Sequence, residues 1–177
     1  DVAFGFRQLA DIAEKALSPA VNDPTTATQA IDRIHDLLRR IAVAPDPCPV
    51  YRDTSGTARL LIPVHGWEEI VHLALDEVRQ YGGDSLQVQR ILRFLLDDLS
   101  ALVEARPDRL VPLQAQQALL DRAAIRAFID PEDRIRAGMA PPDPGSPGRC
   151  GRPRPGRASS DVLEVGLEAR FLELDVL

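Results

Sequence analysis

Residues 16–27 read A-L-S-P-A-V-N-D-P-T-T-A, and this stretch both ends one helix and begins another. Ser18 precedes a proline, which pushes its backbone out of the helical region and predicts the end of a first helix. Asp23 precedes a second proline, which suits the first position of a helix. The Asp23 carboxylate can accept hydrogen bonds from the free amides of a helical first turn. We therefore expect two helices joined by a tight connection.

Apolar residues recur at three- and four-residue spacing on both sides of this connection, which is typical of amphipathic helices. Phe4 and Phe6 lie two residues apart in the first helix, so one of them should point away from the core. The same periodicity continues along the chain. It predicts a third helix from Trp67 to Tyr81, a fourth from a cap at Asp84 to about Ala105 and closed by Pro107, a fifth from about Pro112 to Ile129, and a short sixth after Asp130-Pro131. Gly82 should end the third helix as its C-terminal cap, with Tyr81 packed inward.

Residues 50–62 interrupt the helical pattern after three prolines that end the second helix. Val50-Tyr51-Arg52 and Ala58 to Ile62 flank the turn sequence Asp53-Thr54-Ser55-Gly56, which predicts a short β-hairpin. The expected fold class is therefore mainly α, with five to six amphipathic helices packed as an irregular bundle and one short β-hairpin.

The composition divides the chain into three parts. Residues 1–139 have the apolar periodicity of one helical domain. Residues 140–160 are rich in Pro, Gly and Arg, and we expect a disordered linker because they cannot bury enough apolar surface. Residues 161–177 read as a divergent tail of uncertain structure.

Charge and motif content exclude several classes of function. The chain of 177 residues carries a net charge of −6, which argues against nucleic acid as a partner. It has no phosphate-binding loop, no G-x-S-x-G and no G-x-G-x-x-G. His35 lies on the expected solvated side of the second helix, and no two histidines have the i, i+4 spacing of a helical metal site, so we expect no metal and no cofactor. The two cysteines form no C-x-x-C pair, which fits a reducing compartment.

Two segments resemble a known family. They are D-V-A-F-G-F-R-Q-L-A-D-I-A-E-K-A-L-S-P-A-V-N-D-P-T-T-A, residues 1–27, and D-E-V-R-Q-Y-G, residues 76–82. Both resemble the predicted bacterial membrane proteins grouped as domain of unknown function 2254, over roughly residues 1–139. The resemblance implies a soluble C-terminal part of a protein with several membrane-spanning helices. It also implies a cell-membrane location, with this domain on the cytoplasmic side. Expected partners are the protein's own transmembrane region and neighbouring subunits of a homo-oligomer.

The candidate site is polar and centres on the first connection. Helix capping alone explains Asp23, and Ser18 and Asn22 are common turn residues. The other interpretation is a small polar site at the amide-rich start of the second helix. The residues of this candidate site or structural motif are Arg7, Gln8, Asp11, Ser18, Asn22, Asp23, Thr25, Thr26 and Arg79.

Two functions are compatible with this sequence. The first is a non-enzymatic domain that packs against its own membrane part or against other subunits. The second is a small-molecule-sensing or enzymatic domain with its site around Ser18–Thr26. A polar pocket lined by Arg7, Asn22, Asp23 and Arg79 would favour the second. A connection with every polar group capped would favour the first.

Overall fold

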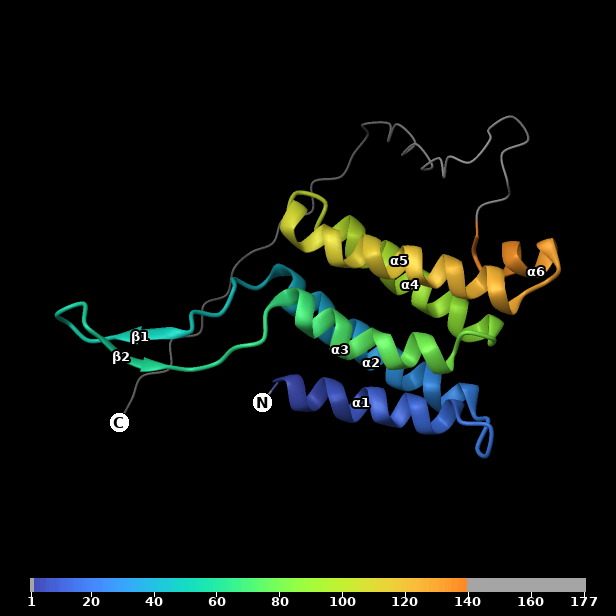
Figure 1. Ribbon diagram of the computed structural model, residues 1–177, viewed down its shortest axis with the longest axis horizontal. Helices are drawn as coiled ribbons and strands as arrows, with labels where there is room; N and C mark the ends of the chain where they lie inside the picture. Colours follow the sequence, from blue (N-terminus) through green and yellow to red (C-terminus); the bar gives the residue numbers. More distant parts are fainter. Residues whose placement is uncertain (1, 140–177) are drawn as a thin grey trace, which may run out of the picture. The chain divides into compact units, whose positions relative to one another are not determined.

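The computed structural model describes residues 2–139, which belong to a compact unit running from Asp1 to Pro142 (Figure 1). The expected mainly α fold with one short hairpin is confirmed. The predicted linker and tail, residues 140–160 and 161–177, lie outside the described residues. The elements are α1 (Val2–Leu17), α2 (Pro24–Val43), β1 (Val50–Arg52), β2 (Ala58–Leu61), α3 (Trp67–Tyr81), α4 (Leu86–Leu102), α5 (Pro107–Ala127) and α6 (Pro131–Arg136).

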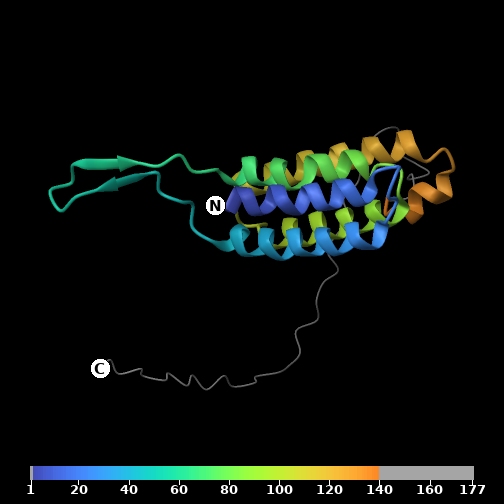
Figure 2. The same ribbon diagram turned by 90° about the horizontal axis from the view of Figure 1, so that it is seen from below.

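Helices α1 to α5 form a closed ring in which each packs mainly on two others (Figures 1 and 2). The order around the ring is α1, α2, α4, α5 and α3, and α6 packs on α4. Helices α1, α3 and α5 run in one direction, and α2 and α4 run in the other. The ring encloses the core, whose largest fully buried apolar side chains are Phe6, Ile31, Ile34, Leu38, Leu75, Leu92, Leu95, Leu99, Leu113 and Leu120.

The two phenylalanines of α1 point to opposite sides, as expected from their spacing. Phe6 is completely buried in the ring interior, whereas 60% of Phe4 is exposed. The buried residues of α1 follow the helical period, since small alanines at positions 3, 10, 13 and 16 share the face of Phe6. These alanines allow α2 and α3 to approach α1 closely.

The boundary between α4 and α5 differs from the sequence prediction. Pro107 does not close the fourth helix but is the first residue of α5, and Pro112 lies inside that helix. Proline lacks an N–H, so it is tolerated both after a helix end and at a helix start, and the sequence pattern does not separate these roles. The predicted cap of α4 is also wrong by one residue, because Ser85 rather than Asp84 accepts the hydrogen bond from Val88 N.

His35 is not on a solvated surface, contrary to expectation. Its side chain is 13% exposed, and Nε2 lies 2.8 Å from Oδ2 of Asp98 on α4. The ring also meets Phe94 edge to face, with 5.8 Å between the ring centroids. Burial raises the pKa of Asp98, but hydrogen bonds from Arg39 and His35 outweigh it and hold that pKa below its usual value. These contacts join α2 to α4.

The end of α3 is only partly as predicted. Gly82 is the C-terminal cap, and its N–H donates to the Val78 carbonyl at 2.9 Å. Tyr81 was expected to pack inward, but it is exposed. A hydrogen bond with the Glu14 carboxylate on α1 raises the pKa of the Tyr81 hydroxyl. A tyrosine side chain can occupy this partly exposed position because its hydroxyl forms a hydrogen bond at the surface.

The hairpin turn is held by the carboxylate of Asp53. It accepts hydrogen bonds from the amides of Ser55 and Thr57, from the Ser55 hydroxyl at 2.6 Å and from Arg59 Nε at 2.7 Å. Gly56 completes the turn at a φ of 83°, which a residue with a Cβ rarely adopts. The hydroxyl of Ser55, and next the Arg59 guanidinium, lower the pKa of Asp53 to about 2.

We expect the turn to lose this anchor only in strong acid. Because the folded pKa lies below the ordinary 3.8, the carboxylate supports the turn fully above about pH 4, and this support is lost as the pH falls through about 2. An NMR titration of the Asp53 side-chain carboxyl carbon measures the midpoint directly. The variant Ser55→Ala should move the midpoint upward. A midpoint near 3.8 in the unaltered protein would contradict the prediction.

Candidate functional site

The connection between α1 and α2 uses its polar groups within itself. Asp23 is the N-cap of α2, and its Oδ1 accepts hydrogen bonds from Thr25 N and Thr26 N, each at 3.1 Å. Its Oδ2 accepts from the Thr26 hydroxyl at 2.5 Å, and this bond is the main reason that the pKa of Asp23 is lowered. Ser18 donates to the Lys15 carbonyl at 2.8 Å, and Asn22 takes the left-handed conformation at a φ of 46°.

Replacing this cap should destabilise the domain modestly. We expect Asp23→Ala to lower the free energy of unfolding by about 1 kcal/mol, the usual cost of losing an N-cap side chain. Urea denaturation gives the value, and Asp23→Asn should recover most of it. An unchanged midpoint in Asp23→Ala would show that the carboxylate has a role other than capping.

The remaining predicted site residues lie apart from the connection. Gln8 and Asp11 are exposed on α1. Arg7 lines a groove between α1 and α3, whereas Arg79 lines a separate pocket beside α5, and neither lining includes a residue from Ser18–Thr26. Helices α1 and α2 run in opposite directions, which places Arg7 more than two turns from their connection.

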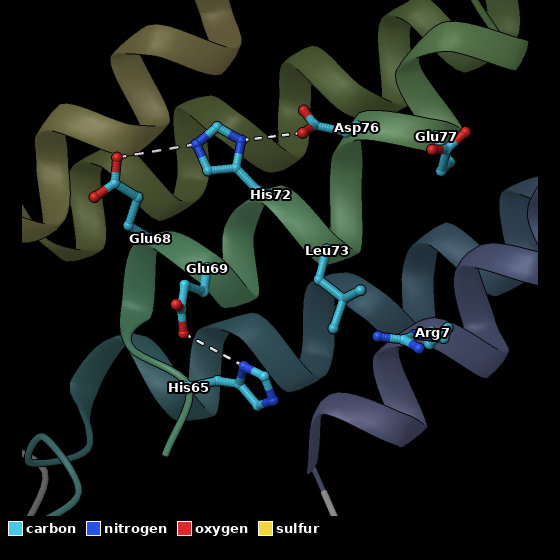
Figure 3. Close-up of a pocket in the computed structure, with 8 residues that line it drawn as sticks. All are labelled: Arg7, His65, Glu68, Glu69, His72, Leu73, Asp76 and Glu77. Atoms are coloured by element: carbon cyan, nitrogen blue, oxygen red, sulfur yellow. Dashed lines mark hydrogen bonds and ion pairs between the residues drawn. The ribbon is translucent and has the colours of Figure 1, made fainter. Parts of the chain in front are cut away.

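The α1–α3 groove has a volume of about 590 Å³, and half of its lining residues are acidic (Figure 3). Successive turns of α3 present carboxylates and histidines to it at i, i+4 spacing. Its lining residues are Arg7, His65, Glu68, Glu69, His72, Leu73, Asp76 and Glu77. Four carboxylates therefore face one guanidinium, and the groove should attract cationic groups.

Two histidines pair with carboxylates in this groove. His65 Nδ1 lies 3.3 Å from Glu69 Oε2. His72 Nδ1 lies 3.1 Å from Asp76 Oδ2, and its Nε2 lies 4.0 Å from Glu68 Oε1. These pairs do not converge on one point, and within residues 2–139 no group of three or more His, Cys, Asp or Glu side chains could hold a metal ion.

A buried glutamine supports the groove from behind. Gln116 on α5 is 1% exposed, and its Nε2 donates to Asp76 Oδ1 at 2.7 Å. Its Oε1 accepts from Arg79 Nε at 3.2 Å. The amide also lies 3.2 Å from His72 Nδ1, which can accept from Gln116 or donate to Asp76 but cannot do both in one tautomer. Arg79 therefore serves the α3–α5 contact.

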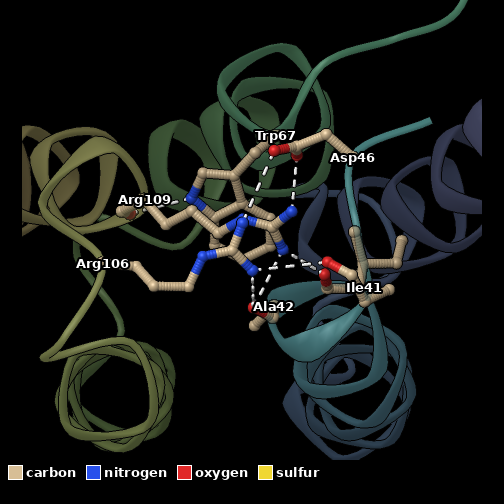
Figure 4. A network of polar contacts seen from close by, with 7 residues as sticks. Ile41, Ala42, Asp46, Trp67, Arg106 and Arg109 are labelled. Carbon is tan, nitrogen blue, oxygen red and sulfur yellow. Dashed lines mark hydrogen bonds and ion pairs between the residues drawn. The ribbon is translucent and has the colours of Figure 1, made fainter. Parts of the chain in front are cut away.

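A second polar network joins the end of α2 to the starts of α3 and α5 (Figure 4). Arg109 is 2% exposed and donates to the carbonyls of Ile41 at 2.5 Å and Ala42 at 2.8 Å. It also donates to Asp46 Oδ1 at 2.5 Å. The Trp67 ring lies 5.6 Å from the guanidinium carbon, and Trp67 Nε1 donates to the Arg109 carbonyl at 2.8 Å.

This network fixes both ends of the segment that carries the hairpin. Asp46 precedes β1 and Trp67 follows β2, and both contact Arg109. The sequence prediction missed Arg109 because the fifth helix was expected to begin only at Pro112. The signal was present, since Arg109, Leu113, Gln116 and Leu120 follow helical spacing on one buried face.

The hairpin carries apolar side chains on both faces. In the antiparallel register Val50 lies opposite Leu61, and Tyr51 lies opposite Leu60. Partners across a ladder share a face, and successive residues alternate, so the two pairs occupy opposite faces. Leu61 is 72% exposed, and every residue of β2 is exposed. In the described part of the chain, no helix covers this pair of strands.

The comparisons with known proteins identify the family. A profile of domain of unknown function 2254, described as predicted membrane proteins, matches residues 1–98. The chain belongs to this family. Uncharacterised proteins of Mycobacterium bovis and of two Mycobacterium tuberculosis strains are 38% identical to it over 136 residues. No solved structure matches it.

The family match concerns only a part of these larger proteins. The aligned residues make up 76% of this chain but 26% of each mycobacterial relative, so the chain spans about a quarter of their length. Among the helices of residues 2–139, none is both long enough and apolar enough to cross a bilayer.

Proposed function

We propose that residues 1–139 form a soluble, non-enzymatic interaction domain of a predicted membrane protein. It packs against that protein's own transmembrane region and against neighbouring subunits of a homo-oligomer. The observation that carries this proposal is the hairpin, whose apolar side chains are exposed on both faces. A two-stranded hairpin without a packed face is at best marginally stable in water, so a surface that covers it is needed.

The outer face of α1 supports the same function. Phe4 and Ile12 are both exposed on this face. Exposed aliphatic and aromatic side chains that gather on one element mark sites of protein or membrane contact. The matched family consists of predicted membrane proteins, and relatives are about four times as long as the aligned region, so their remaining segments supply candidate partners.

The connection between α1 and α2 supports the proposal because it argues against the alternative function, a small-molecule or enzymatic site. The carboxylate of Asp23 and the hydroxyls of Ser18 and Thr26 all have partners within two turns of the chain. A small-molecule or enzymatic site at Ser18–Thr26 would need free polar groups around a hollow, and neither pocket described above is lined by these residues.

We place the domain on the cytoplasmic side of the membrane. Cys48 is a free, exposed cysteine at the root of the hairpin. A free thiol on a surface is typical of a reducing compartment. The acidic surface, with a net charge of −6 over the chain, also fits a domain that is held near a membrane by protein contacts rather than by anionic lipid.

Photo-crosslinking in the full-length membrane protein tests this proposal. A photoreactive amino acid replaces Phe4 or Leu61, and a control replaces Gln29, which is an exposed polar residue of α2. We expect Phe4 and Leu61 to crosslink to transmembrane segments or to a neighbouring subunit, identified by mass spectrometry. Crosslinking at these positions no higher than at Gln29 would contradict an interaction role for both surfaces.

A further inference from the structure

The polar tip of the hairpin limits what can cover its apolar strands. Asp53, Ser55 and Thr57 form the turn, and the Asp53 carboxylate stays ionised far below neutral pH. A bilayer would have to receive this tip first, and burying an ionised carboxylate in hydrocarbon costs several kcal/mol. A protein surface can instead cover the apolar strands and leave the tip in water.

The strands also carry a positive charge of their own. Arg52 in β1 and Arg59 in β2 are exposed, and these are the charged side chains of the two strands. Arg59 gives one nitrogen to Asp53, and its side chain remains 70% exposed. A partner surface should therefore combine carboxylates with apolar contact area.

The α1–α3 groove has this composition. Its wall carries four carboxylates, among which Glu68 and Glu77 lie about 14 Å apart along α3, estimated from the rise per helical residue. Residues 58 and 62 of the hairpin lie about 14 Å apart by the rise of a strand, so the two lengths match. Leu73 supplies an apolar floor between the carboxylates. Within one chain the hairpin leaves this groove open.

We propose that the hairpin of one copy of this chain docks in the α1–α3 groove of a second copy. The exchange is reciprocal, so each copy gives one hairpin and receives the other, and two-fold symmetry closes the assembly as a dimer. Arg52 and Arg59 then face the carboxylates of the groove, and Leu60 or Leu61 covers Leu73. This inference rests on the proposed interaction function and specifies the partner of one of its surfaces.

Charge reversal on each side of the contact tests the proposal in the full chain. The hairpin variant carries Arg52→Glu and Arg59→Glu. The groove variant carries Glu68→Arg and Glu77→Arg, which leaves Glu69 free to accept its hydrogen bond from Gly66 N. The control carries Arg40→Glu and Arg122→Glu, at exposed positions of α2 and α5 that form no side-chain hydrogen bond or ion pair within residues 2–139. Analytical ultracentrifugation gives the dimer dissociation constant of each.

We expect the unaltered chain and the control to form dimers, and each reversed variant to dimerise at least about tenfold more weakly. A chain that carries both pairs of reversals should restore the dimer, because each reversed hairpin then meets a reversed groove. This rescue separates a charge contact from a misfolded hairpin, which no partner would rescue.

Three results would overturn the inference. They are a monomeric unaltered chain at high concentration, a dimer that neither reversal weakens, and a dimer that depends on the hairpin but not on the groove. The last result would indicate pairing of two hairpins instead. None of these results changes what the crosslinks from Leu61 to other segments of the full-length protein would show. The proposed interaction function is therefore tested independently of the dimer.

Discussion

Arg109→Ala should lower the free energy of unfolding by about 3 kcal/mol. The substitution removes the shortest hydrogen bonds to the carbonyls of Ile41 and Ala42, and it withdraws the cation from the face of Trp67. Ala44 N at 3.1 Å and Arg106 at 3.4 Å still donate to these carbonyls, but truncating a side chain that is 2% exposed also leaves a cavity, so the cost exceeds that of a surface ion pair. Asp46 is 63% exposed and contributes little to the loss, because its carboxylate can be solvated once the arginine is gone.

Two variants control this measurement by urea denaturation. Arg122→Ala removes an exposed arginine from the same helix and should change stability by less than about 0.5 kcal/mol. Arg109→Lys keeps the positive charge but lacks the planar fork that reaches two carbonyls and Asp46 together, so it should recover only part of the loss. Equal destabilisation by Arg109→Ala and Arg122→Ala would mean that the network contributes no net stability.

Phe6→Ala should be at least as damaging, with an expected loss of about 3–5 kcal/mol. Phe6 has no exposed surface and fills the ring interior between α2 and α3, so its removal leaves a cavity that the small alanines around it cannot close. Phe4→Ala removes the same phenyl group from an exposed position of the same helix. It should lower the free energy of unfolding by less than about 0.5 kcal/mol. Thermal or urea unfolding of both variants measures this contrast, and similar losses would place Phe4 in a packed environment as well.

Much of this fold was predictable because its local signals agree with its tertiary packing. Asp23-Pro24 and Asp130-Pro131 both begin helices in the way that a cap followed by proline predicts. The hairpin was recognisable from its turn sequence, and α3 begins and ends at Trp67 and Tyr81, as its periodicity indicated. In each case the residues of one continuous segment are enough to predict the structure of that segment.

The polar networks were less predictable because they join residues far apart in the chain. His35 meets Asp98, and Gln116 meets Asp76, only after the ring of helices has closed. A polar residue on a helix has the same local pattern whether it faces solvent or a distant partner, so His35 was assigned to the surface. Arg109 was missed because the fifth helix was expected to begin only at Pro112, which left Arg109 outside the helical face that buries it.

The clamp at Arg109 also bears on how this chain can change without losing its fold. Asp46 and Trp67, the two roots of the hairpin segment, both contact the Arg109 side chain. The segment between them is therefore a loop whose ends are held together by the helical ring. Each doubling of such a loop costs only about 0.6 kcal/mol in closure entropy. Insertions and deletions between the roots should therefore change the free energy of folding only slightly. The sequence of the hairpin segment can therefore change as its binding partner changes, while the fold of the helical ring stays the same.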